Sequence, residues 1–308
     1  MIACLGEFYA SYFAHKGDFK KAGEYKASAI LARESLLRWL DKEPISHIKN
    51  RYNFDSFIGS ESYGNFNKYM ITVASFIYLA FLFADDSIEP TVSVAEKGGY
   101  IAQTSEDFHK TFINFGGYFL QIDTNADFHY DANGLGRIHK KDCEPTVCLS
   151  VPFSPHPNYV IDGENPSGMS ICCYAETNGK RLLGADEYAV YSLVKSENDE
   201  NHVKAVFDVK LSDEITVTHQ YVVTDLGVDI SLSGYENSGF MLPVFDFDGS
   251  DNTDITIAEN AVKVEYNGSV CKYSFDGEIS ADFQYYYNRN GRYRVYSVNS
   301  KKLHIEIK

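Results

Sequence analysis

The pattern of apolar residues changes once along the chain, near Ser87–Pro90. Before this point, apolar residues recur at the spacing of helices, as over residues 18–40. After it, short segments such as Ile215–Val223 alternate between apolar and polar side chains, which is typical of strands. Many short strands separated by turns indicate an antiparallel sandwich. We therefore expect a multidomain α+β fold, with an all-helical part over residues 1–88 and a large β-sandwich over residues 89–308.

The helical part is predicted to carry more apolar surface than its own helices cover. Three helices are expected, over residues 2–15, 18–40 and 60–84. The longest apolar run, Met70–Ala84, is too short to span a bilayer, which needs about 20 residues, and it predicts a buried helix. No membrane partner is therefore expected. The apolar faces must pack on the sandwich, on helices that this chain lacks, or on a second copy in a homo-oligomer.

The charge balance excludes one class of partner. Acidic residues number 43 against 28 Lys and Arg, so the net charge is −15, and the sequence contains no run of basic residues. No nucleic acid is expected, because a phosphate backbone is bound by clustered basic residues. The 23 Tyr and 21 Phe residues against one Trp are typical of strands. The alternative is a groove for a polar, ring-shaped ligand such as a sugar.

The six cysteines form no Cys-x-x-Cys pair, so we expect them to be reduced thiols rather than zinc ligands. The adjacent Cys172 and Cys173 should lie on opposite faces of one strand. Residues 1–15 lack a basic segment and a cleavage site, so no signal peptide is expected. The localisation stays open, and it is cytoplasmic if Met1 is the genuine start.

Two stretches concentrate the polar side chains that line sites. The first, Asn50–Tyr69, leads from a loop into a helix, and the second, Ile122–Lys140, is dense in His, Asp, Asn and Arg. In the second, strand alternation puts Arg137 and His139 on one face, where they could bind a carboxylate and move a proton. The alternative for both stretches is a set of solvated side chains without a ligand.

Two further stretches have alternative interpretations. Asp246–Asp254 offers oxygen ligands at alternate positions, which suits calcium, but its glycine is misplaced for an EF-hand loop. No cofactor or metal is therefore expected, and a structural Ca²⁺ or Zn²⁺ ion is the alternative, with candidate ligands Asp246, Asp248 and Asp251. The segment Tyr285–Arg294 is either a sugar platform or a hairpin with cross-strand tyrosine pairs.

The order of a helical part followed by an antiparallel β-domain resembles the C-terminal part of a heparinase II/III-like polysaccharide lyase. The helix start at Gly59–Tyr63 and the segment His129–His139 carry this resemblance. It implies the last helices of an α/α toroid, a β-sandwich, and β-elimination on a uronate-containing glycan. It also implies that Tyr63 transfers the proton, with Tyr69 as the alternate, and that a histidine of the β-domain, His129 or His139, assists.

The resemblance further implies that an acidic oligo- or polysaccharide is bound. The proton next to a carboxylate becomes acidic only when the carboxylate charge is neutralised, and nearby cations lower the pKa of a tyrosine base. Arg137 is the implied carboxylate clamp. The other substrate-binding candidates are Asn50, Arg51, Glu61 and Tyr130. Local positive charge is expected at Arg51, Lys68, Arg137, His139, Lys140 and Arg289–Arg294.

Two functions compete with a carbon–oxygen lyase that acts on polysaccharides. One is a non-catalytic carbohydrate-binding or scaffold β-sandwich, in which tyrosines bind sugar and nothing is cleaved. The other is a glycoside hydrolase with a carboxylate pair such as Glu61 and Asp55. The product distinguishes the three, because only elimination leaves an unsaturated uronosyl end.

Overall fold

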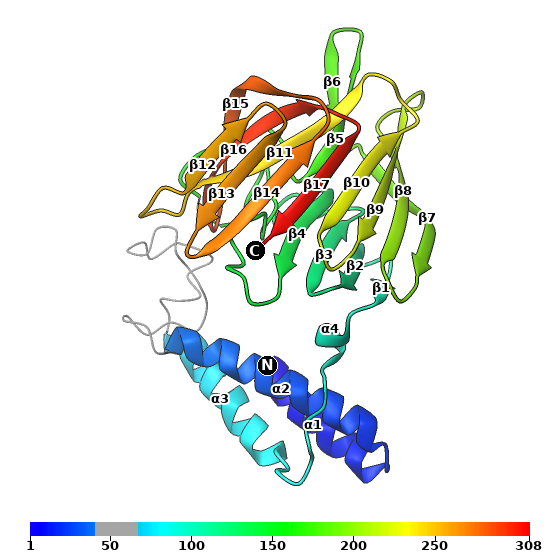
Figure 1. The fold of residues 1–308 in the computed structure, drawn as a ribbon. Helices are drawn as coiled ribbons and strands as arrows, with labels where there is room; N and C mark the ends of the chain where they lie inside the picture. The colour runs from blue at the N-terminus through cyan, green and yellow to red at the C-terminus, as the bar shows by residue number, and fades with distance from the viewer. Residues whose placement is uncertain (41–66, 160) are drawn as a thin grey trace. The chain divides into compact units, whose positions relative to one another are not determined.

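A computed structural model describes residues 1–40, 67–159 and 161–308 of the chain (Figure 1). Its helices are α1 (Ile2–His15), α2 (Phe19–Leu40), α3 (Asn67–Phe83) and α4 (Val94–Lys97). The chain divides into two compact units, of which one holds these helices and the other holds every described strand, from Gly99 to Lys308. The predicted α+β class, with a helical part before an antiparallel β-sandwich, is confirmed. The first seven residues of the helix expected over 60–84 lie outside the described residues.

Small residues set the contact between α1 and α2. A side-chain carbon on Gly6 would lie only 2.8 Å from the Cβ of Ala29, so glycine is needed where the helices approach. Ala10 and Ala22 are fully buried in the same unit. The buried Lys26 ammonium lies 2.9 Å from the Glu7 carboxylate, which compensates its charge inside this contact.

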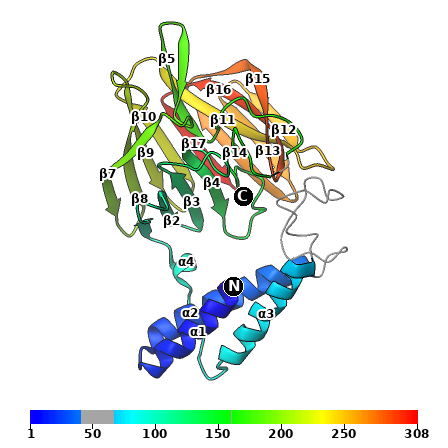
Figure 2. The same cartoon turned by 180° about the vertical axis from the view of Figure 1, so that it is seen from behind.

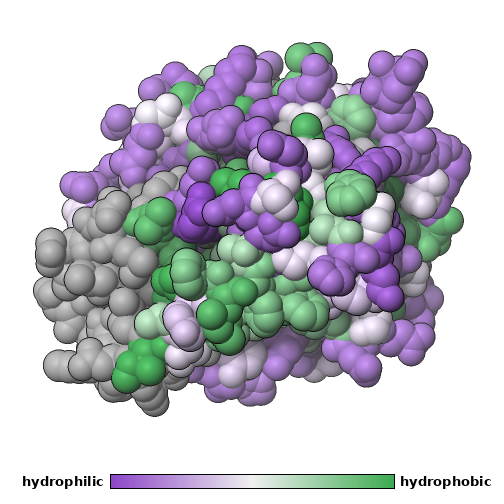
Figure 3. Space-filling model, turned by 90° about the horizontal axis from the view of Figure 1, so that it is seen from below, coloured by the Kyte–Doolittle hydropathy of each residue, from purple (hydrophilic) through white to green (hydrophobic). Residues whose placement is uncertain are grey.

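Helix α3 leaves much of its apolar surface exposed. Phe81 is 72% exposed and Ile71 is 67% exposed, although the ring of Phe83 packs on that of Phe8 at 5.2 Å. Figure 3 shows apolar side chains gathered over the face that the helices form. The buried helix that the sequence predicts is therefore not buried within the part of the chain described here. Among the described helices, none is long and apolar enough to cross a membrane.

The strands form three antiparallel sheets. The four-stranded sheet has the order β1 (Tyr100–Gln103), β2 (Lys110–Phe115), β3 (Tyr118–Asp123), β4 (Gly134–Lys140). The five-stranded sheet has the order β15 (Glu278–Asn288), β16 (Gly291–Asn299), β11 (Ser238–Phe247), β5 (Cys172–Thr177), β6 (Lys180–Leu183). The eight-stranded sheet has the order β12 (Asp254–Ala258), β13 (Ala261–Tyr266), β14 (Ser269–Phe275), β17 (Lys302–Ile307), β10 (Val228–Ser233), β9 (Thr216–Val223), β8 (Val203–Lys210), β7 (Val190–Asn198).

One continuous core joins the three sheets. The eight-stranded sheet forms one layer, and the other two sheets form the opposite layer (Figures 1 and 2). Alternate residues of β8 and β9 point into the core, among them Phe207, Val209 and Tyr221, as the sequence pattern predicts. Ile307 of β17 donates its backbone N–H to the Tyr118 hydroxyl of β3 at 3.0 Å, so a polar contact also links the layers.

The cysteines are free thiols, and most of them are buried. Cys172 and Cys173 begin β5, and both are fully buried because this strand is covered on both faces. Burial raises the pKa of the Cys172 thiol to about 12. This thiol therefore stays protonated at neutral pH and is a packing group rather than a nucleophile.

A histidine lies in the same core. His219 of β9 is 1% exposed, and its Nδ1 lies 3.2 Å from the Tyr221 hydroxyl. Burial lowers the pKa of His219 to about 3, because the core does not solvate the imidazolium ion. The folded sandwich therefore holds this histidine in its neutral form.

We expect the free energy of unfolding to fall as the pH drops below about 6.5. Unfolded His219 takes up a proton near its ordinary pKa of 6.5, whereas folded His219 does so only near 3. Each pH unit between these values should therefore cost about 1.4 kcal/mol. His219→Gln should flatten this part of the profile in denaturant titrations. The exposed-histidine variant His156→Gln should keep the wild-type slope, and an unchanged slope in His219→Gln would contradict the assignment.

Candidate functional site

The outward face of the four-stranded sheet carries the polar side chains expected at β4. Pairing of β3 with β4 puts Gln121 opposite Arg137 and Phe119 opposite His139. Ile138, which lies between Arg137 and His139 in the sequence, is fully buried in the core. Arg137 and His139 therefore share the face that points away from the core, as strand alternation predicts.

Aromatic rings lie beside His139 on this face. The ring of Phe112, from β2, stacks on that of Phe119 with centroids 5.7 Å apart and planes 26° from parallel. The Phe119 ring in turn lies 6.2 Å from the His139 imidazole. The three rings form a row across β2, β3 and β4 that offers a partly exposed apolar surface beside the imidazole ring.

Asp131 fixes the Arg137 side chain. One carboxylate oxygen lies 3.3 Å from Arg137 Nη2, and the other lies 2.8 Å from Lys110 Nζ. Lys110 also forms an ion pair with the buried Asp123. Because one carboxylate bridges two cations, the Arg137 guanidinium is held in place while its side chain stays 24% exposed. Its remaining N–H groups are the donors that an anionic ligand could reach.

The buried Asp123 carboxyl belongs to the same cluster of charged side chains. Burial raises the pKa of Asp123, and the neighbouring Lys110 ammonium opposes this rise. Lys110, Asp123, Asp131 and Arg137 together carry two positive and two negative formal charges. The group is therefore close to neutral as a whole, and an arriving carboxylate would add the negative charge that Arg137 can bind.

His129 and Tyr130 lie in the loop between β3 and β4 and contact other groups. His129 Nδ1 lies 3.0 Å from the Asp127 carboxylate on an exposed part of the loop. The Tyr130 hydroxyl accepts a hydrogen bond of 3.4 Å from the Asn158 amide. Of the two histidines considered, His139 is thus the one on the Arg137 face.

The helix-start candidates cannot be placed on this face. Asn50, Arg51, Glu61 and Tyr63 lie outside the described residues. Tyr69 belongs to α3, but its side chain is also outside the described set. Their roles in proton transfer and substrate binding stay predictions.

Two basic groups expected to bind a ligand are engaged within the fold. The Lys140 ammonium donates to the backbone oxygens of Gly116 and Asp225 at 2.7 and 3.1 Å, and it lies 4.1 Å from the centre of the Tyr118 ring. Arg292 and Arg294 both bind Asp246 at 2.6 Å. Lys140 therefore joins turns of the sandwich, and Arg292 and Arg294 share one buried carboxylate.

The stretch Asp246–Asp254, which is the alternative site for a structural calcium or zinc ion, makes other contacts within the fold. Both Asp246 oxygens face guanidinium groups, which occupy the positions that a cation would need. Asp248 accepts hydrogen bonds from the backbone N–H groups of Ser250 and Asp251 at 2.8 and 2.7 Å, as in an Asx turn. Among residues 1–40, 67–159 and 161–308, no group of three or more His, Cys, Asp and Glu side chains is arranged to hold a metal.

Sequence reasoning missed Lys110 and Phe112 as parts of this face, and it included Asp131 only as a member of the stretch Ile122–Lys140, without a role. Asp131 and Lys110 are 21 residues apart and meet only because β2 pairs with β3. The alternation of Phe112 with buried Ile113 was the one local signal that Phe112 lies on this face.

We expect Asp131→Asn to lower the free energy of unfolding by about 2 kcal/mol, because it leaves Lys110 and Arg137 without their shared carboxylate. Chemical denaturation measures the change. Asp225→Asn, at an exposed carboxylate in the β9–β10 turn, is the matched control and should change stability by less than about 0.5 kcal/mol. Equal effects of the two variants would show that the bridge contributes nothing.

No family model matches the chain, and no curated protein matches it either. Solved structures do match. The heparinase III gene product BT4657 aligns with a TM-score of 0.49 and 11% identity, over 98% of this chain and 51% of that chain. Heparan sulfate lyase HepC from Pedobacter heparinus gives 0.48 and 11%, over 98% and 51%. The chondroitin lyase ODV-E66, a baculovirus envelope protein, gives 0.36 and 9%, over 94% and 58%. The chain spans about half the length of these structures. Solved structures of the heparinase type are thus among those to which this chain is similar.

Proposed function

We propose that the outward face of the four-stranded sheet binds the carboxylate of a uronate-containing glycan for β-elimination. The observation that carries the proposal is the pair of Arg137 and His139, which project from one face of β4 with Asp131 holding the guanidinium. Arginine binds carboxylates through paired N–H groups, and imidazole exchanges protons near neutral pH. One short strand thus presents both kinds of group to the same ligand.

The elimination needs three events at the sugar. A base removes the proton on the carbon next to the carboxylate, the electron pair forms a carbon–carbon double bond, and the neighbouring carbon–oxygen bond breaks. The leaving oxygen then takes a proton from an acid. Arg137 would stabilise the negative charge that develops on the carboxylate during the first event. We assign the proton transfers to Tyr63 or Tyr69, with His139 assisting.

The aromatic row supports a sugar as the ligand. Phe112 and Phe119 give a flat, partly exposed apolar surface, on which the C–H face of a sugar ring can pack. The acidic oligo- or polysaccharide that we propose would then place its carboxylate at Arg137 and its ring against the aromatic side chains. The positive charge of Arg137 governs this contact more than the negative net charge of the whole chain does. At physiological ionic strength, exposed charges more than about 8 Å away are largely screened.

The homo-oligomer expected from the apolar helices is proposed as the assembly that covers the exposed side chains of α1 and α3. Size-exclusion chromatography with light scattering tests it. The mass of a single copy at all concentrations would contradict this part of the proposal.

Substitution of Arg137 tests the function directly. Full-length protein is incubated with a panel of acidic glycans, and the ultraviolet absorbance of unsaturated uronate is followed. Arg137→Ala should lower kcat/KM by about 100- to 1,000-fold, as for other groups that stabilise a developing oxyanion. His139→Ala should lower kcat by about 100-fold or more. Lys272→Ala, at an exposed lysine of the eight-stranded sheet, is the control and should keep the wild-type rate. Absence of the absorbance with every glycan would contradict the lyase function.

Two tyrosine variants and one glutamate variant separate the competing functions. Tyr63→Phe should abolish elimination if Tyr63 is the base, while Tyr69→Phe should then leave the rate within about threefold. If instead Glu61→Ala abolishes a hydrolytic activity that Tyr63→Phe retains, the chain is a glycoside hydrolase with a carboxylate pair. Sugar binding without any turnover would identify a carbohydrate-binding module.

A further inference from the structure

The hairpin of β15 and β16, at the edge of the five-stranded sheet, has two different faces. Tyr286 pairs with Tyr293 across the two strands, and both rings are buried in the core. Side chains alternate along a strand, so Tyr285 and its cross-strand neighbour Arg294 lie on the opposite face. The cross-strand tyrosine pair therefore accounts for the inner face of the hairpin, and the outer face carries charged and aromatic side chains.

Arg292 and Arg294 converge on one carboxylate of β11. Arg292 Nη2 lies 2.6 Å from Asp246 Oδ2, and Arg294 Nη2 lies 2.6 Å from Asp246 Oδ1. Within the part of the chain that the structure describes, no second carboxylate forms an ion pair with either guanidinium. Two positive charges thus meet one negative charge. The cluster keeps one positive charge in excess, which a singly charged anion would balance.

Solvent reaches both arginines from outside the sheet. Their side chains are 30% and 33% exposed, whereas the Asp246 carboxylate is buried and holds them from the inside. Arg292 donates from Nε and Nη2 to the same carboxylate oxygen, at 2.7 and 2.6 Å, so its Nη1 group takes no part in this contact. A guanidinium has five N–H donors, and Arg292 therefore has donors left for a ligand.

Aromatic rings orient the two guanidinium groups. That of Arg292 lies 4.6 Å from the centre of the Tyr285 ring and 5.3 Å from that of Phe247. That of Arg294 lies 5.2 Å from the centre of the Phe283 ring. Phe283 and Tyr285 are exposed and pack edge to face, with ring centres 5.1 Å apart. Cation–π contacts and ion pairs thus fix both arginines in advance, which lowers the entropy lost when a ligand binds.

The excess charge and the exposed rings together narrow the class of ligand. The C–H face of a sugar ring can pack on an exposed aromatic side chain, and a carboxylate or a sulfate ester on that sugar supplies one negative charge. A phosphate monoester carries about −1.5 to −2 at neutral pH, more than this cluster lacks. Two arginines that share a carboxylate are also too few to bind a nucleic acid backbone.

We propose that the outer face of this hairpin binds an acidic sugar residue of a glycan without cleaving it. We call this surface the hairpin platform, formed by Phe283, Tyr285, Arg292 and Arg294. The arginines bind the carboxylate or sulfate ester, and the rings pack on the sugar. The platform lies on a different sheet from Arg137, and it is independent of the proposed elimination.

Isothermal titration of the full chain tests the proposal in an Arg137→Ala background, in which the proposed elimination face has lost its carboxylate clamp. The ligands are a hyaluronan tetrasaccharide, which carries carboxylates, and a carrageenan tetrasaccharide, which carries sulfate esters. We expect binding of at least one of them, and the comparison identifies the anionic group. Arg292→Lys and Arg294→Lys should each weaken binding by about tenfold, because lysine keeps the charge beside Asp246 but loses the paired N–H groups and the ring contact.

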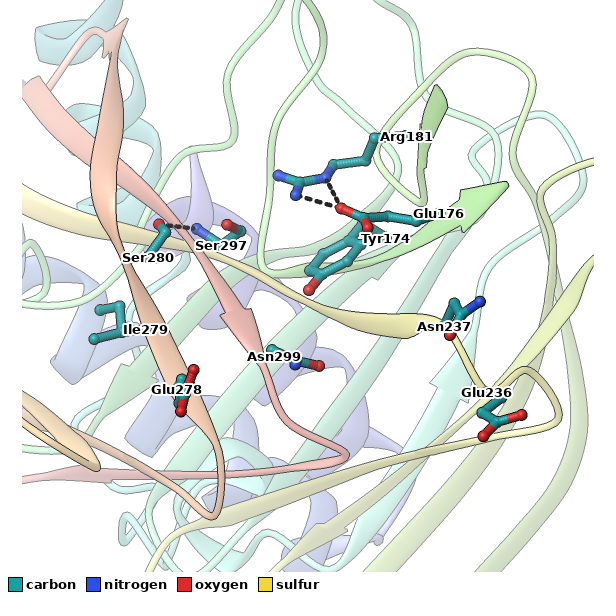
Figure 4. Close-up of a pocket in the computed structure, with 10 residues that line it drawn as sticks. All are labelled: Tyr174, Glu176, Arg181, Glu236, Asn237, Glu278, Ile279, Ser280, Ser297 and Asn299. Atoms are coloured by element: carbon teal, nitrogen blue, oxygen red, sulfur yellow. Dashed lines mark hydrogen bonds and ion pairs between the residues drawn. The ribbon is translucent and has the colours of Figure 1, made fainter. Parts of the chain in front are cut away.

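Arg181→Lys is the matched control on the same sheet. Figure 4 shows Arg181 bound to Glu176, with Nη2 2.6 Å from the carboxylate, and its guanidinium lies 4.5 Å from the centre of the Tyr174 ring. Arg181 thus also has a ring and an ion pair, but one carboxylate balances its single charge. This variant should bind as the Arg137→Ala protein does, and a loss equal to that of the platform variants would overturn the assignment.

Further variants and ligands test the rings and the sugar. Phe283→Ser and Tyr285→Ser, at exposed side chains, should each weaken binding by about threefold or more. Chitotetraose lacks the negative charge and a tetraglutamate peptide lacks the sugar rings, so both should bind at least about tenfold more weakly. Equal binding of chitotetraose would overturn the role of the arginines, and equal binding of tetraglutamate would indicate an acidic peptide instead.

The proposal as a whole has its own decisive outcome. If neither acidic tetrasaccharide binds to Arg137→Ala protein whose thermal unfolding midpoint is that of the wild type, the hairpin platform is not a glycan site. No cleavage is measured in these titrations, so the hairpin platform and the elimination can fail separately.

Discussion

Burial of apolar side chains between the eight-stranded sheet and the two smaller sheets is the constraint on which the rest of the β unit depends. Strands such as β8, β9 and β10 direct alternate side chains into this core and the others outward. Leu120 and Ile138 are fully buried, so Phe119 and His139 point to the opposite face. The candidate site is thus positioned by core packing, and its strand-borne groups owe their directions to residues that never meet a ligand.

The sequence predicts the parts of the fold that depend on local pattern. Alternation over 203–223 and helical spacing over 18–40 are properties of adjacent residues, and the structure has strands and a helix there. The sheet order is not local, since β17, at the end of the chain, lies between β14 and β10. The shared face of Arg137 and His139 follows from spacing alone. The bridge from Asp131 to Lys110 depends on strand pairing, which no short stretch of sequence reveals.

The charge of a residue in the sequence was a poor guide to whether its side chain can bind a ligand in the folded protein. Lys140 looks as suited to an anionic ligand as Arg137 does, but its ammonium binds backbone oxygens. A folded chain satisfies its buried charges first, and only what remains can serve a ligand. Arg137 retains part of its capacity because it shares its carboxylate with Lys110.

The alternation of inward and outward side chains along β4 limits how this site can change through insertions and deletions. Adding or removing one residue between Leu135 and His139 would turn Arg137 and His139 toward the core and carry Ile138 outward. The strand already contains an irregularity of this kind, where its register against β3 shifts next to Gln121 and Ile122. A second insertion or deletion of one residue, or a single one of two residues, would return Arg137 and His139 to the outward face. Length variation that keeps this site intact should therefore occur in even steps along β4, whereas the loop between β3 and β4 is free of that restriction.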